Sequence, residues 1–353
     1  MYDAGGRHIH DLHLDELRPG TIERLWLHVV NDKLGAPIRI PMLAARGSSP
    51  GPTLGLTAAI HGNELNGVRA IQRIFDRVDP TRLRGNLIGA LVLNVPGYLL
   101  EQREFNDGQD LNRLAPGKVD GTTSQVYVHR VIERIVRKFD VHIDLHTASA
   151  GRINSHYVRA DMSDPRTSRL ARLQNPSIIV DNRAKNSTLR GSASALGIAS
   201  ITVELRDPQV VQRGVVSDAL AGLHNAMIDL GMVGDELSGG RTRTWVCDAS
   251  FWTHTDEGGI LQVLPQLCER VEKGALVAHV RNVFGDITRS YVAPEDAIIV
   301  GRSVNPANQT GSRIAHFGIN PREEEVLRQG DQTLAQLWST RASEGWSPRD
   351  VPR

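Results

Sequence analysis

His61 and Glu64 are the first residues in the chain whose types and spacing could bind a metal ion. They stand in the segment HGNE, directly after the apolar run TLGLTAAI, which has the length of a buried strand. Both side chains can reach one ion if the backbone between them turns tightly, and Gly62 permits such a turn. The carboxyl ends of strands are also where α/β folds bind ligands. The alternative is a helix start with a surface His and an exposed Glu, the commoner origin of an isolated HxxE.

A second candidate ligand, His146, ends the predicted strand VHIDLH. Asp144 stands two residues earlier and therefore shares its face of that strand. We expect the Asp144 carboxylate to contact the far side of the imidazole and so to orient it. A buried His that is simply bonded to a neighbouring carboxylate is the alternative. His142 lies deeper on the same face, and for it we favour that purely structural role.

Glu204 follows four apolar or small residues in the strand ITVEL, at the expected mouth of the sheet. A carboxylate in this position is suited to act as a general base or acid beside water bound to a metal ion. The alternative is a strand-end Glu paired with Arg206.

Together these residues are typical of a catalytic zinc site with two His ligands and one carboxylate. His61, Glu64 and His146 would hold one Zn²⁺ per chain and leave an open position for water. The ion would lower the pKa of that water toward about 7. Glu204 would accept its proton and pass it to a leaving amine.

A third group of polar residues follows in the segment DLNR, preceded by Arg103. Asn112 and Arg113 could hold a substrate carboxylate through charge-assisted hydrogen bonds. Arg103 could place positive charge where a tetrahedral intermediate develops its oxyanion. A solvated loop arginine is the alternative for each of the two arginines.

The elements that must position these residues alternate between strands and helices, which predicts an α/β fold with a mixed, largely parallel sheet flanked by helices. The period-2 and continuous apolar runs predict strands within 22–46 (two strands joined by a turn), 53–60, 86–95, 140–146, 176–181 and 199–205. Helical spacing predicts helices over 67–78, 125–139 and 215–233.

The helical period disappears after about residue 240. We therefore expect a catalytic domain over 1–240, a smaller C-terminal all-β domain over 241–320, and a C-terminal helix with a polar tail over 321–353. The helix of that last segment is expected within 323–341.

Composition excludes several classes of protein. The 41 basic and 40 acidic side chains nearly cancel, so bulk attraction to nucleic acid or to an anionic membrane is not expected. Two cysteines make no disulfide framework, and no apolar run reaches the length of a membrane span. We expect a soluble, cytoplasmic protein. His8, His10 and His13 indicate only adventitious metal binding, and exposed strand edges of the β domain are compatible with a homodimer.

The motifs IHGNE, DLNR, DLHT and VEL, in this order, resemble the succinylglutamate desuccinylase/aspartoacylase family, a branch of the zinc carboxypeptidase-like fold. The resemblance covers roughly residues 35–320. It implies zinc on the predicted trio, Glu204 as general base, Arg103 near the oxyanion, and Asn112 with Arg113 on a substrate carboxylate. Arg152 and Asn154 are further candidates for substrate contact.

The resemblance implies removal of an acyl group from a small N-acylated amino acid or a related amide. One departure concerns Arg206, because the aspartoacylase branch has a Gly soon after the catalytic Glu. That difference bears on the shape and charge of the pocket. Two alternatives remain open, a zinc carboxypeptidase that acts on peptides and a non-catalytic binding protein of the same fold.

Overall fold

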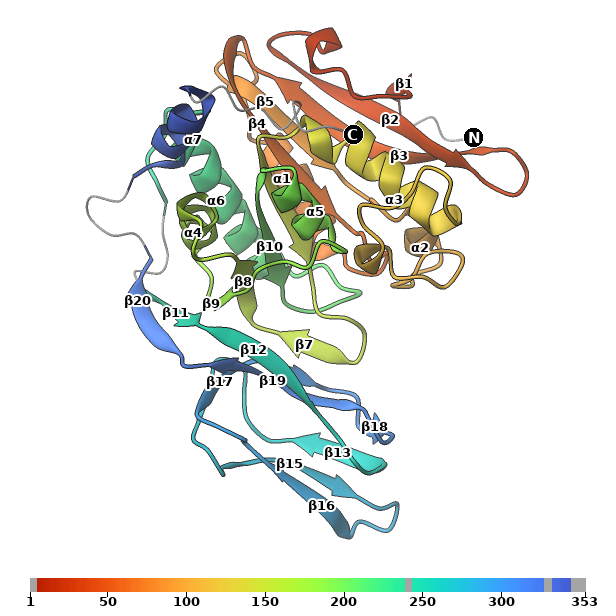
Figure 1. Cartoon of the computed structure of the whole chain (residues 1–353), viewed down its shortest axis with the longest axis vertical. Helices are drawn as coiled ribbons and strands as arrows, with labels where there is room; N and C mark the ends of the chain where they lie inside the picture. Colours follow the sequence, from red (N-terminus) through yellow and green to blue (C-terminus); the bar gives the residue numbers. More distant parts are fainter. Residues whose placement is uncertain (1–4, 239–242, 327–331, 344–353) are drawn as a thin grey trace.

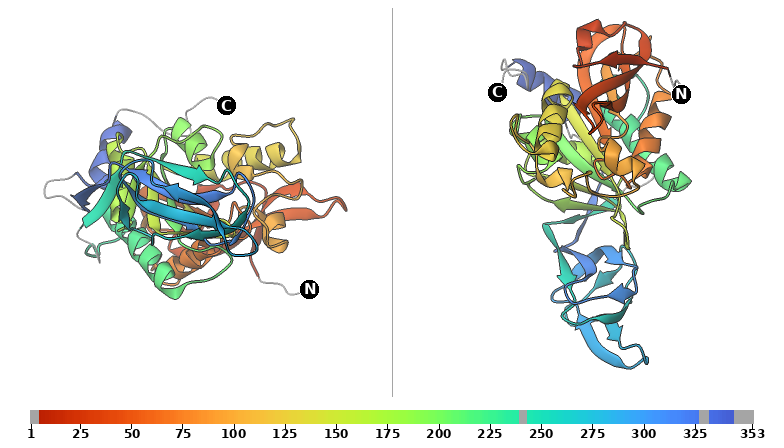
Figure 2. Two further views of the ribbon diagram at one scale, coloured as in Figure 1. Left: turned by 90° about the horizontal axis from the view of Figure 1, so that it is seen from below. Right: turned by 90° about the vertical axis from the view of Figure 1, so that its right-hand side faces the viewer.

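The structure is a computed structural model that describes residues 5–238, 243–326 and 332–343. An α/β body contains the N-terminal two thirds of the chain, and an elongated module of strands projects from one end of it (Figure 1). The projecting module is equally clear from the side (Figure 2). No helix among the described residues is long and apolar enough to cross a membrane.

Within the described residues, one sheet of eleven strands forms the centre of the body. Its spatial order is β1 (Arg7–Ile9), β2 (Thr21–Asn31), β3 (Pro37–Arg46), β5 (Arg84–Ala90), β4 (Ser49–Ala58), β6 (Val141–His146), β10 (Ala199–Leu205), β8 (His156–Ala160), β9 (Ile178–Asp181), β11 (Arg243–Cys247) and β20 (Arg322–Glu325). Six of the ten neighbouring pairs are parallel: β1 with β2, β5 with β4, β4 with β6, β6 with β10, β8 with β9, and β9 with β11. The predicted mixed, largely parallel sheet is therefore confirmed.

Helices cover both faces of this sheet. The helices are α1 (Asn66–Phe75), α2 (Val95–Leu99), α3 (Thr123–Arg134), α4 (Pro165–Leu173), α5 (Leu189–Ala195), α6 (Arg213–Asp229) and α7 (Leu334–Ser343), with 3₁₀ turns η1 (Leu14–Glu16), η2 (Leu111–Arg113) and η3 (Val136–Lys138). One hydrophobic cluster joins α1, α4 and α6 to the central strands, and a second joins α3 and α5 to the opposite face. The two clusters fix the sheet from both sides and hold its strand ends in place.

The central strands read as continuous apolar runs because both of their faces are covered. Every residue of β6 and of β10 is buried. A polar side chain in either strand must therefore find a partner inside the protein or lie at the strand end. His142 does the former, since Nε2 lies 2.8 Å from Thr57 Oγ1 and Nδ1 lies 2.9 Å from Ser200 Oγ. His142 is therefore buried and hydrogen-bonded as predicted, but its partners are two hydroxyl groups and not the expected carboxylate.

The projecting β module consists of two further sheets. The first contains β12 (Ala249–His254), β19 (Arg313–Ile319), β17 (Ala297–Ser303) and β14 (Arg270–Val271), with β7 (Arg152–Asn154) paired to β17. The second contains β16 (Ile287–Val292), β15 (Leu276–Arg281), β13 (Gly259–Val263) and β18 (Ala307–Asn308). Since β7 comes from the middle of the catalytic segment, the module is tied directly to the loops around the site.

The structure corrects several predicted boundaries. The strand predicted over 86–95 ends at Ala90 and the chain turns into α2, whose N-cap Asn94 accepts a hydrogen bond from Gly97 N at 2.9 Å. The helix predicted over 125–139 ends at Arg134.

The helix predicted within 323–341 begins only at Leu334, because residues 322–325 form the edge strand β20 beside β11. β11 itself extends the large sheet. The predicted boundary at residue 240 and the tail beyond 343 lie outside the described residues.

Candidate active site

The candidate residues gather where three adjacent parallel strands end. His61 follows β4, His146 is the last residue of β6, and Glu204 lies near the end of β10. Glu204 and His146 are direct register partners, and β4 pairs with β6 on its other side. The sheet thus brings together groups that are more than 140 residues apart in the chain.

The predicted metal trio converges. Nδ1 of His61 lies 2.8 Å from Glu64 Oε1, and Nδ1 of His146 lies 3.0 Å from Glu64 Oε2. One ligand atom from each residue lies within 4.8 Å of the other two, and all three side chains are buried. Within the described residues this is the one group of three or more His, Cys, Asp or Glu side chains with that property.

The donor set fits a zinc ion. Nδ1 of His61 is buried and lacks a hydrogen bond, although it faces a carboxylate oxygen. The remaining ring nitrogens each face another carboxylate, with His61 Nε2 3.2 Å from Asp110 Oδ1 and His146 Nε2 2.8 Å from Asp144 Oδ2. This arrangement fixes both imidazoles with Nδ1 toward the site, as is common for His ligands of metal ions. Asp144 lies where it was predicted, whereas the contact from Asp110 was not foreseen.

The electrostatic environment keeps the Glu64 carboxylate ionised. Burial alone would raise its pKa, but the two imidazoles more than offset this and hold the pKa well below its usual range. The backbone N–H of Thr147 also donates to Oε2 at 3.1 Å. Glu64 is therefore an anionic group ready to bind a cation.

Glu204 has surroundings of a different kind. Asn154 Nδ2 donates to its Oε2 at 3.1 Å, Tyr157 OH donates to its Oε1 at 3.3 Å, and Arg159 Nε lies 3.7 Å from Oε1. Burial raises its pKa, because little water reaches the carboxylate. Glu204 pairs with Arg159 and not with Arg206, which is exposed.

Arg103 reaches the site from the loop after α2. Its Nη1 donates to Glu64 Oε1 at 3.1 Å and to Ser149 Oγ at 2.8 Å, while Nη2 donates to Asp110 Oδ2 at 2.8 Å. This guanidinium therefore lies beside the metal trio, where positive charge can stabilise a developing oxyanion.

Asn112 and Arg113 belong to η2 and line the same cavity. The Asn112 side-chain oxygen accepts from Leu189 N at 2.8 Å, which directs its amide nitrogen away from that contact. Arg113 Nη1 donates to the Asn112 carbonyl at 2.8 Å. Their predicted contact with a substrate carboxylate stays a prediction. The Asn112 amide and the Arg113 guanidinium belong to neighbouring residues that both line the cavity.

A cavity of about 450 Å³ connects all of these groups. Arg152 lines this cavity, and its contact with a substrate stays a prediction; Asn154 also lines it but donates its amide nitrogen to Glu204. Sequence reasoning missed many further residues of the wall, among them Tyr157, Arg159, Lys185, Arg190, Trp252 and Arg313. None of these six belongs to a recognisable motif, and Trp252 and Arg313 come from the β module.

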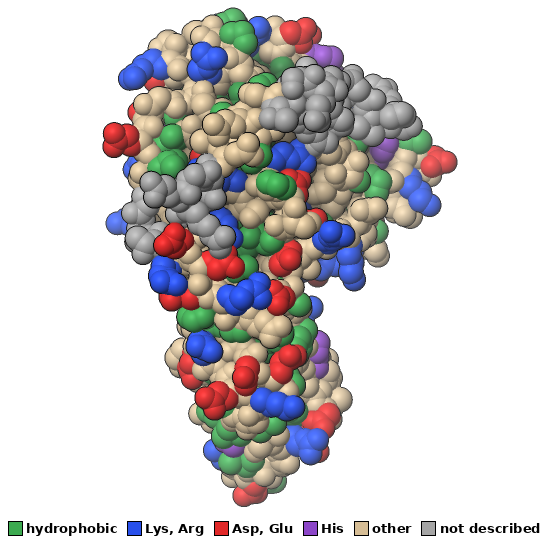
Figure 3. All heavy atoms as spheres, turned by 60° about the vertical axis from the view of Figure 1, so that its left-hand side comes forward, with side chains coloured by type: hydrophobic (Ala, Val, Ile, Leu, Met, Phe, Trp, Pro, Cys, Tyr) green, Lys and Arg blue, Asp and Glu red, His purple; other side chains and the backbone are tan. Residues whose placement is uncertain are grey.

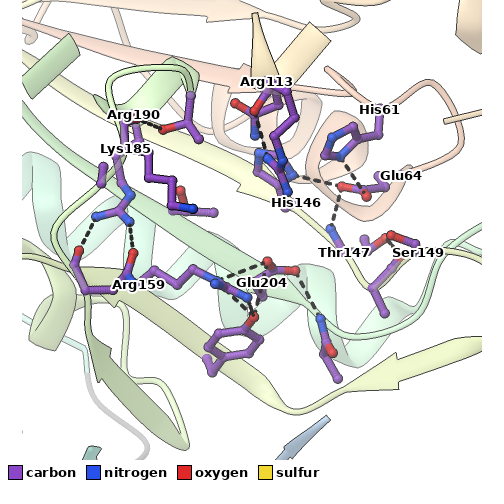
Figure 4. A pocket seen from close by; sticks show the side chains of 18 of the residues that line it. His61, Glu64, Arg113, His146, Thr147, Ser149, Arg159, Lys185, Arg190 and Glu204 are labelled. Atoms are coloured by element: carbon purple, nitrogen blue, oxygen red, sulfur yellow. Dashed lines mark hydrogen bonds and ion pairs between the residues drawn. The ribbon is translucent and has the colours of Figure 1, made fainter. Parts of the chain in front are cut away.

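Figure 4 shows Lys185 and Arg190 at the opposite side of the pocket from His61 and Glu64. Basic side chains are thus concentrated in the cavity. On the outer face shown in Figure 3, basic and acidic side chains are interspersed.

Comparison with known proteins identifies the family. A model of the succinylglutamate desuccinylase/aspartoacylase catalytic domain matches residues 50–230. A curated N-alpha-acetyl-L-2,4-diaminobutyric acid deacetylase from Halomonas elongata is 24% identical over 339 residues, covering 86% of this chain and 92% of the relative.

Solved structures show the same fold. The product-bound ectoine utilization protein EutE (DoeB) from Ruegeria pomeroyi has a TM-score of 0.77 at 21% identity, covering 85% of this chain and 95% of its own. A succinylglutamate desuccinylase/aspartoacylase from Rhodobacter sphaeroides has a TM-score of 0.77 at 21% identity, covering 88% and 97%. Since the family model spans just over half of the 353 residues, the chain belongs to the succinylglutamate desuccinylase/aspartoacylase family.

Proposed function

We propose that this chain is a zinc-dependent deacylase that hydrolyses the amide bond of a small N-acylated amino acid. The observation that carries the proposal is the convergence of His61, Glu64 and His146 beside the buried carboxylate of Glu204. Membership of a family of deacylases supports the same reaction class.

His61 and His146 would hold the ion through Nδ1, and Glu64 through its carboxylate. When bound, zinc supplies a Lewis acid that acidifies water toward a pKa of about 7 and polarises the amide carbonyl. Glu204 takes the proton that water loses as its oxygen bonds to the acyl carbon. Glu204 then gives that proton to the nitrogen as the C–N bond breaks, so that a carboxylic acid and an amine leave.

Arg103 and the Asn112–Arg113 pair position the substrate. The guanidinium of Arg103 lies against Glu64, so it can donate to the oxygen of the attacked carbonyl as negative charge develops there. The side chains of Asn112 and Arg113 can together hold the carboxylate of the amino-acid portion. Fixing that carboxylate sets the amide at the catalytic groups.

Two observations favour a small amide over a peptide. The cavity of about 450 Å³ has the size of a small-molecule site, and Trp252 and Arg313 of the β module form part of its wall. The Halomonas elongata relative is a deacetylase of a small N-acetylated amino acid. A non-catalytic binding protein would have no need of Glu204, which is kept buried and hydrogen-bonded next to the metal trio.

The test is turnover of a panel of N-acetyl and N-succinyl amino acids together with dipeptides. The protein is first stripped with a chelator and then reloaded with Zn²⁺, and free amine is measured. We expect release of amine from N-acyl amino acids only after reloading. Cleavage of dipeptides alone would favour the peptidase, and no cleavage by fully loaded protein would favour the binding protein.

A further inference from the structure

Glu204 lies in a row of side chains that crosses three strands of the large sheet. Its register partner on β6 is His146 of the metal trio, and its register partner on β8 is Tyr157. Register partners on neighbouring strands share one face of a sheet, and so do residues two positions apart on one strand. Arg159 therefore lies on the same face as Tyr157. The sheet thus places a phenol and a guanidinium on the side of Glu204 away from His146.

The guanidinium of Arg159 does not bind directly to the carboxylate beside it. Among the residues that the structure describes, Glu204 has the one carboxylate within 4.0 Å of Arg159, and Nε lies 3.7 Å from Oε1. Hydrogen bonds from a guanidinium to a carboxylate normally measure about 2.7–2.9 Å. Opposite charges this close attract one another, so another group must keep them apart. Figure 4 shows the Arg159 side chain extending toward Glu204.

The hydroxyl of Tyr157 is the group between them. Nε and Nη2 of Arg159 donate to this oxygen at 3.1 and 2.5 Å, and the hydroxyl donates to Glu204 Oε1 at 3.3 Å. A phenol has a single proton to donate. Burial raises the pKa of Tyr157, so that proton stays on the phenol. Because Arg159 occupies the oxygen as an acceptor, the proton is directed to Glu204.

The ring of Tyr157 is held from the β module. Tyr157 is buried, and His316 of β19 contacts its ring edge-on, with centroids 5.9 Å apart and planes at 70°. His316 is also buried and stacks on Trp252 of β12, with centroids 5.0 Å apart and planes 7° apart. These contacts keep the phenol from moving aside. The β module therefore helps to fix the separation between Arg159 and Glu204.

The arrangement leaves room on both oxygens of the Glu204 carboxylate. Asn154 donates to Oε2, and Tyr157 donates to Oε1. A carboxylate has about four lone-pair positions, so each oxygen keeps one that can face water. A guanidinium bound directly could take two positions at once through parallel hydrogen bonds. Such an ion pair would leave the carboxylate less able to accept a proton.

We propose that Tyr157 is a positioning residue for Glu204, whose hydroxyl, anchored by Arg159, orients the carboxylate and keeps the guanidinium from pairing with it directly. The inference rests on the proposed function, in which Glu204 accepts the proton of the attacking water. Tyr157 acts through Glu204 and exchanges no proton with the substrate.

Removal of the hydroxyl is the first test. In Tyr157→Phe the N–H groups of Arg159 lose their acceptor, and the guanidinium moves onto Glu204. We expect kcat to fall about 10–100-fold, the range of a hydrogen bond to a charged group, with KM little changed. The matched control is Tyr127→Phe, since Tyr127 is also buried but donates to the Leu93 carbonyl at 2.6 Å outside the cavity. That control should lose stability and keep wild-type kcat. Wild-type kcat in Tyr157→Phe would overturn the inference.

A second substitution distinguishes this role from simple packing. Arg159→Met removes the guanidinium but keeps an apolar stem. In the Tyr157→Phe/Arg159→Met protein no guanidinium remains at this position to pair with Glu204, so kcat should be about tenfold higher than in Tyr157→Phe. If Tyr157 served only for packing, or if the reaction required Arg159 itself, the second substitution would bring no recovery. A double variant no faster than Tyr157→Phe therefore also overturns the inference.

Crystal structures of the zinc-loaded proteins test the same contacts without turnover. In Tyr157→Phe we expect a nitrogen of Arg159 within hydrogen-bonding distance of Glu204, whereas in Tyr127→Phe the Tyr157 hydroxyl should remain between them. An Arg159 that keeps its wild-type distance from Glu204 in Tyr157→Phe contradicts the inference, whether or not the protein is a deacylase. If the guanidinium moves as expected but wild-type protein hydrolyses no N-acyl amino acid, the deacylase assignment fails, while the role of Tyr157 in separating the two charges is supported.

Discussion

Nε2 of His146 lies 2.8 Å from Oδ2 of Asp144, two residues earlier on the same face of β6. The contact occupies the nitrogen of His146 that faces the interior and leaves Nδ1 directed at Glu64. Thr57 on the neighbouring strand donates to the other oxygen of Asp144 at 2.6 Å, so the carboxylate itself cannot rotate freely. Metal affinity should therefore depend on a residue that does not bind the ion.

Replacing Asp144 by Asn should weaken metal binding while keeping all three ligands. An amide cannot accept the imidazole proton as strongly as a carboxylate, and loss of such a partner typically costs about 10–100-fold in metal affinity. Thr57→Val should have a smaller effect of the same sign, because it releases only one oxygen of Asp144. Competition with a chromophoric zinc chelator measures both. Wild-type affinity in the Asp144→Asn protein would show that the contact does not support the ion.

Replacing His146 by Ala should abolish stoichiometric zinc binding together with activity, since two protein ligands would remain. The control is His142→Asn, on the same strand and the same face, where Thr57 and Ser200 occupy both ring nitrogens. That variant is expected to lose stability but to keep one zinc per chain. Metal analysis after gel filtration distinguishes the two. Full zinc content in the His146→Ala protein would remove His146 from the ligand set.

His142 also predicts how stability depends on pH. Burial lowers its pKa from 6.5 to about 4, so the folded protein keeps this imidazole neutral. Below pH 6.5 the His142 imidazole becomes protonated in the unfolded chain but stays neutral in the folded chain. The free energy of unfolding therefore falls as the pH drops toward 4. The free energy of unfolding decreases by about 3 kcal/mol at most through this one group. Urea unfolding of wild type and of His142→Asn across pH 4–7 should show a steeper decline for wild type. The same dependence of stability on pH in both proteins would contradict a lowered pKa of His142 in the folded protein.

The sequence was most informative where strands end. The runs before His61, His146 and Glu204 are apolar enough to predict buried strands, and parallel strands of one sheet must end near one another. Convergence of the metal trio follows from that rule without any knowledge of the loops. Asp144 could be predicted as well, because a separation of two residues on a strand fixes a shared face.

The remaining wall of the cavity could not be predicted in this way. Trp252 and Arg313 reach the site because β7 leaves the catalytic segment and pairs with β17, a contact between residues about 150 positions apart. No local pattern encodes that pairing. Arg159 looked like one of many arginines, and only the register of β8 against β10 places it beside Glu204. Predicted boundaries were wrong where a cap or an edge strand replaced the expected period, for a strand at Asn94 and for a helix at β20.

Replacing Glu204 by Gln should separate chemistry from metal binding. Glutamine keeps the shape and can still accept a hydrogen bond from Asn154, but it cannot take a proton from water. Loss of a general base typically lowers kcat by about 10²–10⁴-fold. Zinc content should remain one per chain, because Glu204 is not among the predicted ligands. A variant with near wild-type turnover would exclude Glu204 from proton transfer.

Gly62 offers the last test, because the reason for a glycine between the two ligands differs from the one that the sequence suggests. A turn does form there, with Glu64 N donating to His61 O at 3.1 Å, but the stronger constraint is the approach of α2. A Cβ at Gly62 would overlap the backbone of Gly97 and Tyr98. That backbone cannot move as a flexible side chain would, since Asn94 caps α2. Gly62→Ala should therefore displace the loop that carries His61 and Glu64.

The expected result is weaker zinc binding together with a lower melting temperature in the metal-free protein, since the overlap exists without the ion. Gly214→Ala is a matched control, because a Cβ there would meet no atom within 4 Å. Differential scanning calorimetry of metal-free and zinc-loaded protein measures both effects. A Gly62→Ala protein with wild-type melting temperature and zinc affinity would show that the loop can accommodate the added Cβ. The close packing of α2 would then not be what holds the two ligands in place.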